Sequence, residues 1–181
     1  MRKVTAGLMM TLDGVTDTPS NWSGPYFVPE MGAAMAEGIA SADAILLGRR
    51  TYLEFAELWP PQGDGNPMAA FLNNTAKHVA SATLDKVEWS GSELIRGDVV
   101  EAVRELKARP GKNIQVPGSP RLVRSLLAAG VLDELSLMIF PVVLGSGPRL
   151  FDDVTDRMAL ELTGSGAYSS GVISAQYRPA R

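Results

Sequence analysis

Residues 44–52 constrain the fold more tightly than any other stretch of the chain. An apolar run over residues 44–47 leads directly into Gly48, two arginines and Thr51. A short apolar run bounded by glycine is typical of a strand covered on both faces, and the residues after Gly48 predict the first turn of a helix. Free backbone N–H groups and the helix dipole attract anions at such a turn, and the two arginines add full charges. The stretch therefore predicts one half of a nucleotide-phosphate site.

A second strand–glycine–helix junction repeats this logic. Residues 114–116 predict a strand, and Pro117-Gly118-Ser119-Pro120 follows it. Ser119 is a favoured N-cap residue, and a proline is tolerated at the first helical position. Arg121 places a cation beside this junction, as in the first one. If the two strands are neighbours, their helix N-termini are expected to hold the two ends of one pyrophosphate-bearing ligand.

The remaining periodicity alternates strands with helices along the chain. Strands are predicted at residues 4–12, 44–47, 77–84, 93–95, 114–116, 134–143, 159–163 and 172–177. Helices are predicted at residues 30–42, 49–59, 68–75, 99–109 and 120–129. This alternation predicts an α/β fold in which helices cover both faces of a mostly parallel central sheet, with an antiparallel edge at the C-terminus. No linker or repeat divides the chain, so we expect a single domain over residues 1–181.

Composition removes several classes of function. The formal net charge is −3 and the basic residues are dispersed, which argues against a nucleic-acid partner. There are no cysteines and His78 is the only histidine. The sequence therefore excludes thiol catalysis and argues against a Ser-His-Asp triad or a metal site made of Cys or His ligands. The N-terminus has no apolar leader and no run is long enough to cross a membrane, so a cytoplasmic location is expected.

Established nucleotide fingerprints are absent, yet the chain resembles a known family. Gly145-Ser146-Gly147 lacks the third small residue of a Rossmann loop, and no Walker A sequence occurs. The segment Leu47-Gly48-Arg49-Arg50-Thr51-Tyr52, in contrast, resembles the G-R-x-T segment of dihydrofolate reductases. The larger pattern resembles the reductase domain of riboflavin-biosynthesis deaminase/reductases and their stand-alone relatives. That pattern is carried by Thr11-Leu12-Asp13-Gly14 and by residues 46–52, 79–84, 116–122 and 132–151.

This resemblance implies a dihydrofolate reductase-like fold that binds NADPH. By the resemblance, Gly48, Arg49 and Thr51 meet the cofactor phosphates, and Ser81 and Thr83 lie near the adenosine 2′-phosphate. Also by the resemblance, the pyrophosphate and nicotinamide side is enclosed by four residues: Gly118, Ser119, Arg121 and Leu122. The chain departs from the family at position 82. Relatives often carry an arginine there, whereas this chain has Ala82, which shifts recognition of the 2′-phosphate to Arg49 or Arg50.

Asp13 is the candidate catalytic group. Reduction of a C=N or C=O bond needs a proton as well as a hydride, and a partly buried carboxyl with a raised pKa can relay that proton or bind a ring N–H. Asp13 follows the first predicted strand, at the edge of the sheet where ligands bind in α/β folds. The alternative is that Asp13-Gly14 is simply a turn, where aspartate is common.

The loop over residues 15–29 is the candidate substrate side. It holds Trp22, Tyr26 and Phe27. Such rings can stack on a flat ligand beside the nicotinamide, with Trp22 and Tyr26 as the contacts, or can merely plug the edge of the core. Val15 stands where the riboflavin enzymes often have an arginine for their phosphorylated substrate, and the deaminase half of those enzymes is absent. The substrate is therefore left open among pterin-, pyrimidine- and flavin-like rings.

Two functions follow from these observations. The first is an NADPH-dependent reductase that transfers a hydride to a small heterocycle. The second is a non-catalytic NADP-binding module that has lost substrate reduction, and a site for a different nucleotide is a third alternative. Apolar edges such as the strand at 134–143 are usually covered, and the family often forms dimers, so a homodimer is expected.

Overall fold

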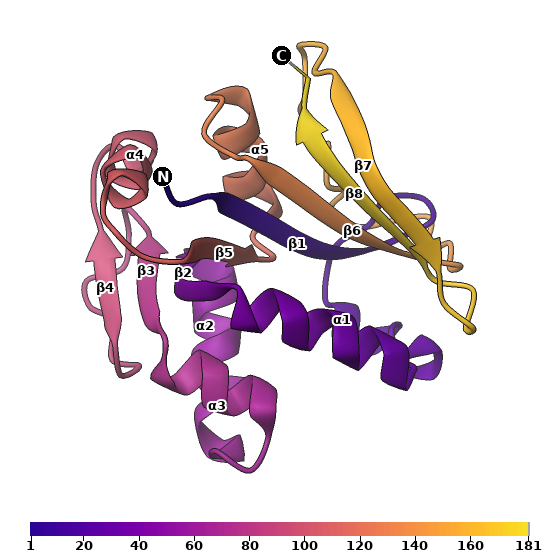
Figure 1. The fold of residues 1–181 in the computed structure, drawn as a ribbon, viewed down its shortest axis with the longest axis horizontal. Coiled ribbons are helices and arrows are strands. Elements are labelled where there is room, and N and C mark those ends of the chain that lie inside the picture. The colour runs from indigo at the N-terminus through magenta and orange to yellow at the C-terminus, as the bar shows by residue number, and fades with distance from the viewer. Residues whose placement is uncertain (181) are drawn as a thin grey trace.

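One sheet organises the molecule, and the described part of the chain is residues 1–180, with the side chain of Ile39 also outside the description. The structure is a computed structural model (Figure 1). Its strands are β1 (Val4–Thr11), β2 (Ala42–Gly48), β3 (Ala76–Ala80), β4 (Ser92–Ile95), β5 (Asn113–Pro117), β6 (Glu134–Phe140), β7 (Leu160–Ala167) and β8 (Ile173–Pro179).

The helices alternate with these strands much as predicted. They are α1 (Pro29–Ala40), α2 (Arg49–Leu58), α3 (Pro67–Asn74), α4 (Val99–Ala108) and α5 (Pro120–Ala128). Short 3-10 turns are formed at Pro19–Asn21, Gly24–Tyr26 and Pro60–Gln62. None of the helices in residues 1–180 is both long and apolar enough to cross a membrane.

The sheet has the strand order β4-β3-β2-β5-β1-β6-β8-β7 within the described residues. All pairings from β4 to β6 are parallel, and β8 pairs antiparallel with both β6 and β7. In Figure 1, α1, α2 and α3 lie on one side of the sheet and α4 and α5 on the other. The predicted fold class, a mostly parallel α/β sheet with an antiparallel C-terminal edge, is confirmed.

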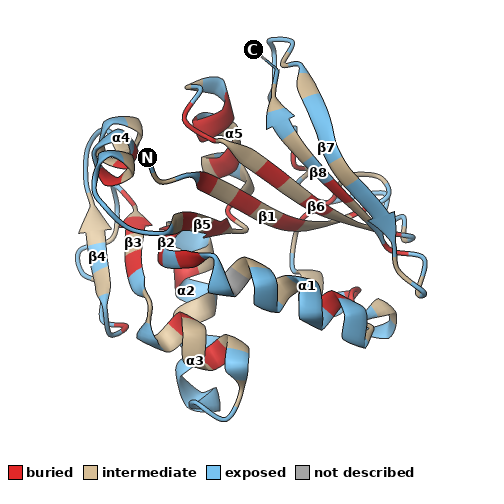
Figure 2. Cartoon of the chain, viewed as in Figure 1, coloured by how far each residue is buried: buried red, intermediate tan, exposed pale blue. Residues whose placement is uncertain are grey.

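Burial follows the two faces of the sheet (Figure 2). On the face of α4 and α5, the largest core cluster gathers alternate residues of β1 and β5, including Val4, Ala6 and Val116. On the opposite face, β2 buries Ile45 and Leu47 against residues of α2, α3 and β3. Because β2 is covered on both sides, its run of apolar residues has no alternation, as the sequence indicated.

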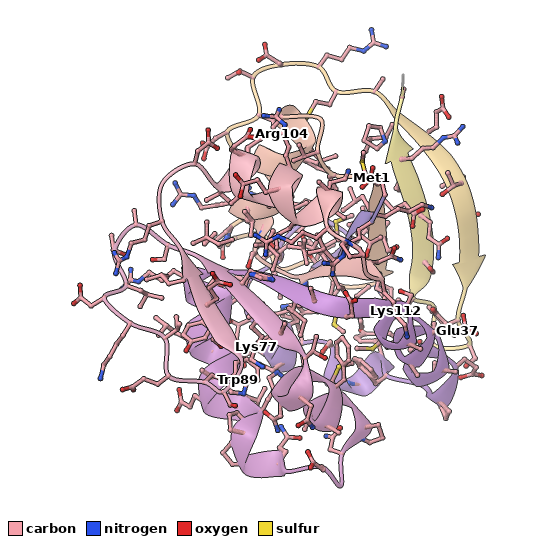
Figure 3. The ribbon with its side chains drawn as sticks, turned by 60° about the vertical axis from the view of Figure 1, so that its left-hand side comes forward. Met1, Glu37, Lys77, Trp89, Arg104 and Lys112 are labelled. Carbon is pink, nitrogen blue, oxygen red and sulfur yellow. The ribbon has the colours of Figure 1, made fainter. Side chains whose placement is uncertain are left out.

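Lys77 on β3 is the largest fully buried polar side chain in the described residues. Its ammonium donates to the carbonyl groups of Leu72, Asn73 and Thr75 at the end of α3, at 2.8, 3.2 and 2.8 Å. It also lies 4.5 Å from the ring centroid of Trp89, beside which it is drawn in Figure 3. The buried cation thus satisfies the last carbonyl groups of a helix.

Three predicted strand ends were wrong by three or more residues. The third strand ends at Ala80 rather than residue 84, because the Ser81 hydroxyl accepts from the backbone N–H groups of Thr83 and Leu84 and folds the chain into a turn. The strand predicted at 134–143 ends at Phe140, since Pro141 has no N–H to continue the ladder. Residues 164–167, expected in a connection, instead extend β7.

A split between β1 and β5 opens the sheet on one side. β5 pairs with β1 only at residues 4–7, whereas β6 follows β1 as far as Thr11. The second half of β1 therefore has a neighbour on one side only. A groove runs from this split along α1 and up to the N-terminal ends of α2 and α5.

Candidate functional site

The two strand–glycine–helix junctions lie side by side. β2 and β5 are paired in parallel, so Gly48 and Gly118 both leave the sheet at its carboxyl edge. The Ser119 hydroxyl joins the junctions directly. It accepts a hydrogen bond from the backbone N–H of Gly48 at 2.8 Å and donates to the Thr51 hydroxyl at 2.8 Å. The predicted pairing of the junctions is therefore present in the structure.

Ser119 occupies the N-cap position of α5, as predicted, but its side chain does not cap the helix. Its backbone is left-handed, with φ 60° and ψ 64°, and its side chain makes no hydrogen bond to the first turn of α5. This conformation directs the hydroxyl toward α2 instead. Pro120 does occupy the start of the helix, as predicted.

Close approach requires glycine at both junctions. A Cβ atom on Gly48 would lie 3.1 Å from the Ser119 Oγ and 3.3 Å from its Cβ, closer than ordinary contacts. Gly118 has φ +82°, a conformation that side chains rarely adopt, and its N–H donates to the Gly7 carbonyl on β1 at 3.0 Å. Glycine at these positions therefore leaves room for the side chains of Ser119 and Thr51, so the two junctions pack directly against each other.

Two arginines beside the junctions have no acidic partner. Arg49 and Arg121 are exposed, line the groove, and form no ion pair with any residue that the structure describes. Arg50, by contrast, is bound to Asp17 at 2.6 Å and to Glu54 at 3.1 Å. Arg49 and Arg121 are therefore the cations available to an anion in the groove.

Ser81 and Thr83 lie at the same edge of the sheet as Gly48. Gly48 pairs with Ala80, the residue before Ser81, and both Gly48 and Ala80 line the groove. Ser81 is nearly buried and its oxygen accepts the two backbone hydrogen bonds of the turn, whereas Thr83 is exposed. The turn presents the Thr83 side chain to solvent beside the groove edge.

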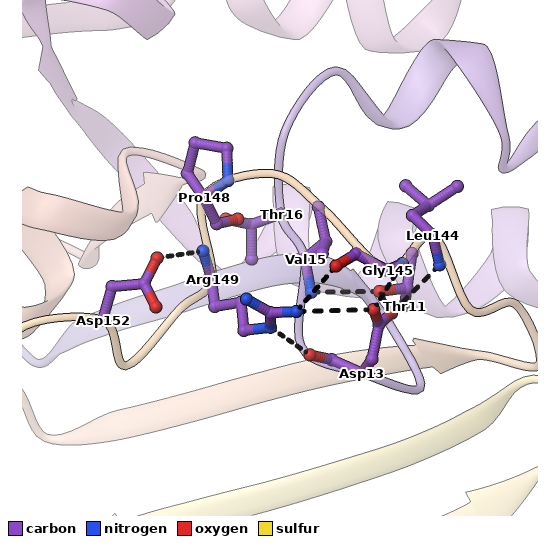
Figure 4. Close-up of polar contacts among 9 residues, drawn as sticks. All are labelled: Thr11, Asp13, Val15, Thr16, Leu144, Gly145, Pro148, Arg149 and Asp152. Atoms are coloured by element: carbon purple, nitrogen blue, oxygen red, sulfur yellow. Dashed lines mark hydrogen bonds and ion pairs between the residues drawn. The ribbon is translucent and has the colours of Figure 1, made fainter.

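Asp13 is held in a network of donors (Figure 4). Its carboxylate accepts from the Thr11 hydroxyl at 2.6 Å and from the backbone N–H groups of Gly145 at 2.9 Å and Leu144 at 3.3 Å. The guanidinium of Arg149 lies 3.8 Å away. The Thr11 hydroxyl, followed by the Gly145 N–H, lowers the pKa of Asp13 from 3.8 to about 2.

The predicted raised pKa of Asp13 was therefore wrong, because donors around a carboxylate stabilise its charged form. The turn interpretation describes the local backbone, since Gly14 has φ +84° and donates to the Thr11 carbonyl at 2.9 Å. Asp13 also fastens this turn to the loop at residues 144–145. Its carboxylate is a fixed anion, with both oxygens engaged.

Sequence reasoning missed Arg149 and Thr11, the partners of this turn. Arg149 donates from Nε to the Asp13 carbonyl at 2.9 Å, and a Cβ on Gly147 would lie 2.9 Å from the Val15 side chain. Val15 is buried, so its position faces the 144–150 loop rather than the groove. No sequence spacing could have revealed the contacts of Arg149 and Gly147, because these residues lie far from Asp13 and Val15 in the chain. Thr11 is a local partner, two residues before Asp13.

The three aromatic side chains of the loop over residues 15–29 lie in two places, two in the core and one in the groove. Trp22 is buried, with its ring centroid 5.2 Å from that of Phe140, and Tyr26 lies edge-on to the same ring at 6.1 Å. Neither Trp22 nor Tyr26 lines the groove, so the structure does not bring the two predicted stacking residues to the ligand. Phe27 does line it and is exposed. The core-plug alternative describes Trp22 and Tyr26.

The walls of the groove near the β1–β5 split are apolar and carry sulfur. Met9 of β1, Met35 of α1 and Met138 of β6 line it, together with Phe27 and Tyr168. Thioether side chains adapt to the shape of a flat ring and contact its edge and face. This wall can pack against a planar ligand.

A comparison with models of protein families shows the family to which this chain belongs. The family model described as "RibD C-terminal domain" matches residues 2–174. The chain belongs to the RibD C-terminal domain family. The resemblance inferred from the sequence is confirmed, and the family is one of reductase-type domains.

Relatives of known sequence or structure cover nearly the whole of this RibD C-terminal domain. "Uncharacterized protein YyaP" of Bacillus subtilis is 30% identical over 182 residues, covering 97% of this chain and 94% of the relative. The deaminase/reductase of Thermotoga maritima is 18% identical with a TM-score of 0.71, covering 99% of this chain and 57% of that one. A dihydrofolate reductase from Enterococcus faecalis, complexed with NADP(H), is 16% identical with a TM-score of 0.63, covering 99% and 97%. These two structures confirm the fold.

Proposed function

We propose that this RibD C-terminal domain is an NADPH-dependent reductase that transfers a hydride to a small heterocyclic ring of the pterin, pyrimidine or flavin type. The proposal is carried by the Ser119 hydroxyl, which accepts from the Gly48 N–H and donates to Thr51, and so joins two helix N-termini into one anion cradle. Paired N-termini suit the two phosphates of a pyrophosphate.

The residues present fit the pyrophosphate of a dinucleotide. Gly48 and Gly118 allow the two junctions to pack together through Ser119 and Thr51, and Arg49 and Arg121 are free of acidic partners among the described residues. In this proposal Thr51 and Ser119 orient the cradle, and Leu122 of α5 lines the nicotinamide side. Bound NADPH would supply the hydride.

Asp13 has a positioning role in this proposal. Its Oδ1 accepts from Thr11 and Leu144 and its Oδ2 from Gly145, and with a pKa of about 2 the carboxyl carries no proton at neutral pH. The proton that accompanies the hydride therefore comes from water in the open groove rather than from Asp13. The carboxylate fixes the loop that closes the end of β1.

Calorimetry with NADPH and with NADH tests the cofactor, and loss of NADPH absorbance in a panel of pterins, pyrimidines, flavins and quinones tests the reaction. We expect tighter binding of NADPH than of NADH and turnover with at least one ring. Binding without turnover across the panel would instead favour the non-catalytic NADP-binding module. No binding of either dinucleotide would refute both functions.

We also propose that the protein is a homodimer. Apolar side chains are exposed at the outer end of β1 and β6, where Leu12 is 64% and Val143 67% exposed, and the Leu12 N–H donates to the Val142 carbonyl. Ile173 on β8 is exposed as well. Exposed apolar side chains of this kind favour association. Light scattering that gave the mass of one chain would contradict the dimer.

A further inference from the structure

One part of the groove, the α2 channel, leads from the anion cradle along helix α2. Thr51, Phe55 and Leu58 are spaced by four and three residues, so they share one face of the helix, and all three line the groove. Thr51 belongs to the cradle through its hydrogen bond with Ser119. The helix rises roughly 10 Å from Thr51 to Leu58. The α2 channel therefore begins at the cradle and extends well beyond it.

The α2 channel carries large apolar side chains that stay exposed. Phe27 is 43% exposed, Leu53 45% and Leu58 53%, and each of them lines the groove. The rings of Phe55 and Trp59, edge to face with centroids 6.0 Å apart, line it as well. Apolar side chains gathered in one groove, rather than scattered over the surface, indicate a site that covers an apolar ligand.

Helix α1 lines the same groove and lies on the same side of the sheet as α2 (Figure 1). Its lining residues are Ala34, Met35, Glu37 and Gly38. None of them is a cation, and the small residues at positions 34 and 38 leave room for a ligand beside the helix. α1 therefore adds apolar surface and one acid to the groove.

The charge around the α2 channel disfavours an anion. Residues 4–76, which include α1, α2 and α3, contain eight acids and only two cations, Arg49 and Arg50. Arg50 is bound to Asp17 at 2.6 Å and to Glu54 at 3.1 Å. Arg49 is the first residue of α2 and lies beside the cradle. Beyond the cradle, α1, α2 and α3 therefore offer a negatively charged ligand no free cation among the described residues.

We propose that the ring reduced by this chain carries an uncharged, apolar substituent, which lies in the α2 channel against Phe27, Phe55 and Leu58. The inference rests on the proposed function. The methionine wall near the β1–β5 split takes the ring, and an alkyl or aryl substituent covers the exposed side chains of the channel, which favours binding in proportion to the apolar area buried. A phosphorylated or carboxylated substituent would lose its hydration there and find no cation in return.

A dihydropterin and an isoalloxazine test the inference when each is prepared with a methyl, a phenylpropyl or a carboxyphenylpropyl side chain. Calorimetry with the NADP⁺-saturated wild-type chain gives the affinities, and NADPH oxidation gives kcat/KM. For at least one ring, we expect the phenylpropyl compound to bind about tenfold or more tightly than the methyl compound. The carboxyphenylpropyl compound should lose most of that gain, because its charge has no partner.

Two variants and a control locate the effect in the α2 channel. Leu58→Asp puts a charge at an exposed helix position, so the affinities for the phenylpropyl and methyl compounds should become nearly equal. Glu54→Lys adds a cation to the channel and should tighten binding of the carboxyphenylpropyl compound. Leu162→Asp is the matched control and should keep the wild-type ratios, since Leu162 is 57% exposed on β7 and does not line the groove.

The outcomes separate this inference from the proposed function. A wild-type chain that binds NADPH, but binds the phenylpropyl compounds no better than the methyl ones, would overturn the inference while NADPH binding stands. A carboxyphenylpropyl compound that binds as tightly as its phenylpropyl counterpart would overturn it as well. If Leu58→Asp kept the wild-type ratios but changed a dimer into a monomer by light scattering, a second copy of the chain would be the occupant of the α2 channel, not a substituent. A wild-type chain that binds neither a dinucleotide nor any of these rings would refute the proposed function and the inference together.

Discussion

The hydroxyl of Ser119 accepts a hydrogen bond of 2.8 Å from the backbone N–H of Gly48, across 71 residues of sequence. This contact connects the starts of α5 and α2, and the Thr51 hydroxyl receives the proton of the same group. One side chain therefore sets the distance between the two halves of the anion cradle. Five predictions concern this cradle, the Asp13 carboxylate and the buried ammonium of Lys77.

Replacing Ser119 with alanine should lower the free energy of unfolding by about 1–3 kcal/mol, because the partly buried Gly48 N–H would lose its acceptor. Chemical denaturation measures the change. Ser125→Ala is the control: its hydroxyl donates to a carbonyl of its own helix and is exposed, so its effect should stay within about 0.5 kcal/mol. Equal effects of the two variants would contradict the prediction.

Arg49→Ala should weaken NADPH binding by about 1.5–3 kcal/mol through the loss of charge-assisted hydrogen bonds to phosphate. Its side chain has no acidic partner among the described residues, so the free protein should lose little stability. Titration calorimetry gives the dissociation constant, with Arg104→Ala as the control, since Arg104 is exposed on α4 and paired with Glu101. An unchanged dissociation constant would remove Arg49 from the site.

The contact between Asp13 and residues 144–145 should be lost at low pH. The pKa of Asp13 is about 2 in the folded chain and 3.8 ordinarily, so its contribution to stability is complete above pH 3.8 and is lost as the pH falls toward 2. The amide resonance of Gly145 should shift in this window, and stability should decline there. Asp13→Asn should abolish the shift; a shift that persists in Asp13→Asn would come from another group.

Lys77→Met should destabilise the fold by about 2 kcal/mol, because the carbonyl groups of Leu72, Asn73 and Thr75 would lose their shared donor. Lys86→Met, at an exposed ion pair, is the control and should change stability by less than about 1 kcal/mol.

The pH dependence of Lys77 has a defined sign. Burial lowers the pKa of Lys77 from 10.5 to about 8, so the unfolded chain binds more protons between these values. Stability from this group should therefore rise as the pH increases from 8 to 10.5. Denaturation curves across this range should show the rise in the wild type and not in Lys77→Met. A rise of equal size in both proteins would show that another titrating group, not Lys77, causes it.

Local signals in the sequence predicted most of the secondary structure. The apolar run before Gly48 acts within a few residues, and the strand that it predicts is present as β2. The Asp98 cap is equally local, since its carboxylate accepts from the N–H groups of Val100 and Glu101. Resemblance supplied the fold family. The predicted end of the third strand was wrong, because the Ser81 hydroxyl accepts from the backbone N–H groups of Thr83 and Leu84 and so competes with strand pairing.

The geometry of the candidate site depends on contacts between residues far apart in the chain, which the spacing of residues in the sequence does not reveal. Nothing local reveals that β2 lies beside β5, or that Ser119 turns away from its own helix. Two of the donors to Asp13 come from residues 131 and 132 positions away, so their part in lowering its pKa could not be predicted, whereas the Thr11 hydroxyl lies only two positions away. Burial of Trp22 likewise reflects Phe140 on a distant strand.

The central place of β1 also governs how the molecule can be assembled. β1 is synthesised before both of its partners, because β5 and β6 begin only at Asn113 and Glu134. A growing chain therefore carries an apolar strand with two open edges until these later segments have left the ribosome. Its decisive contacts are long-range, so we expect slow folding and a need for protection during synthesis. The anion cradle can exist only after β5 has joined β1 to β2.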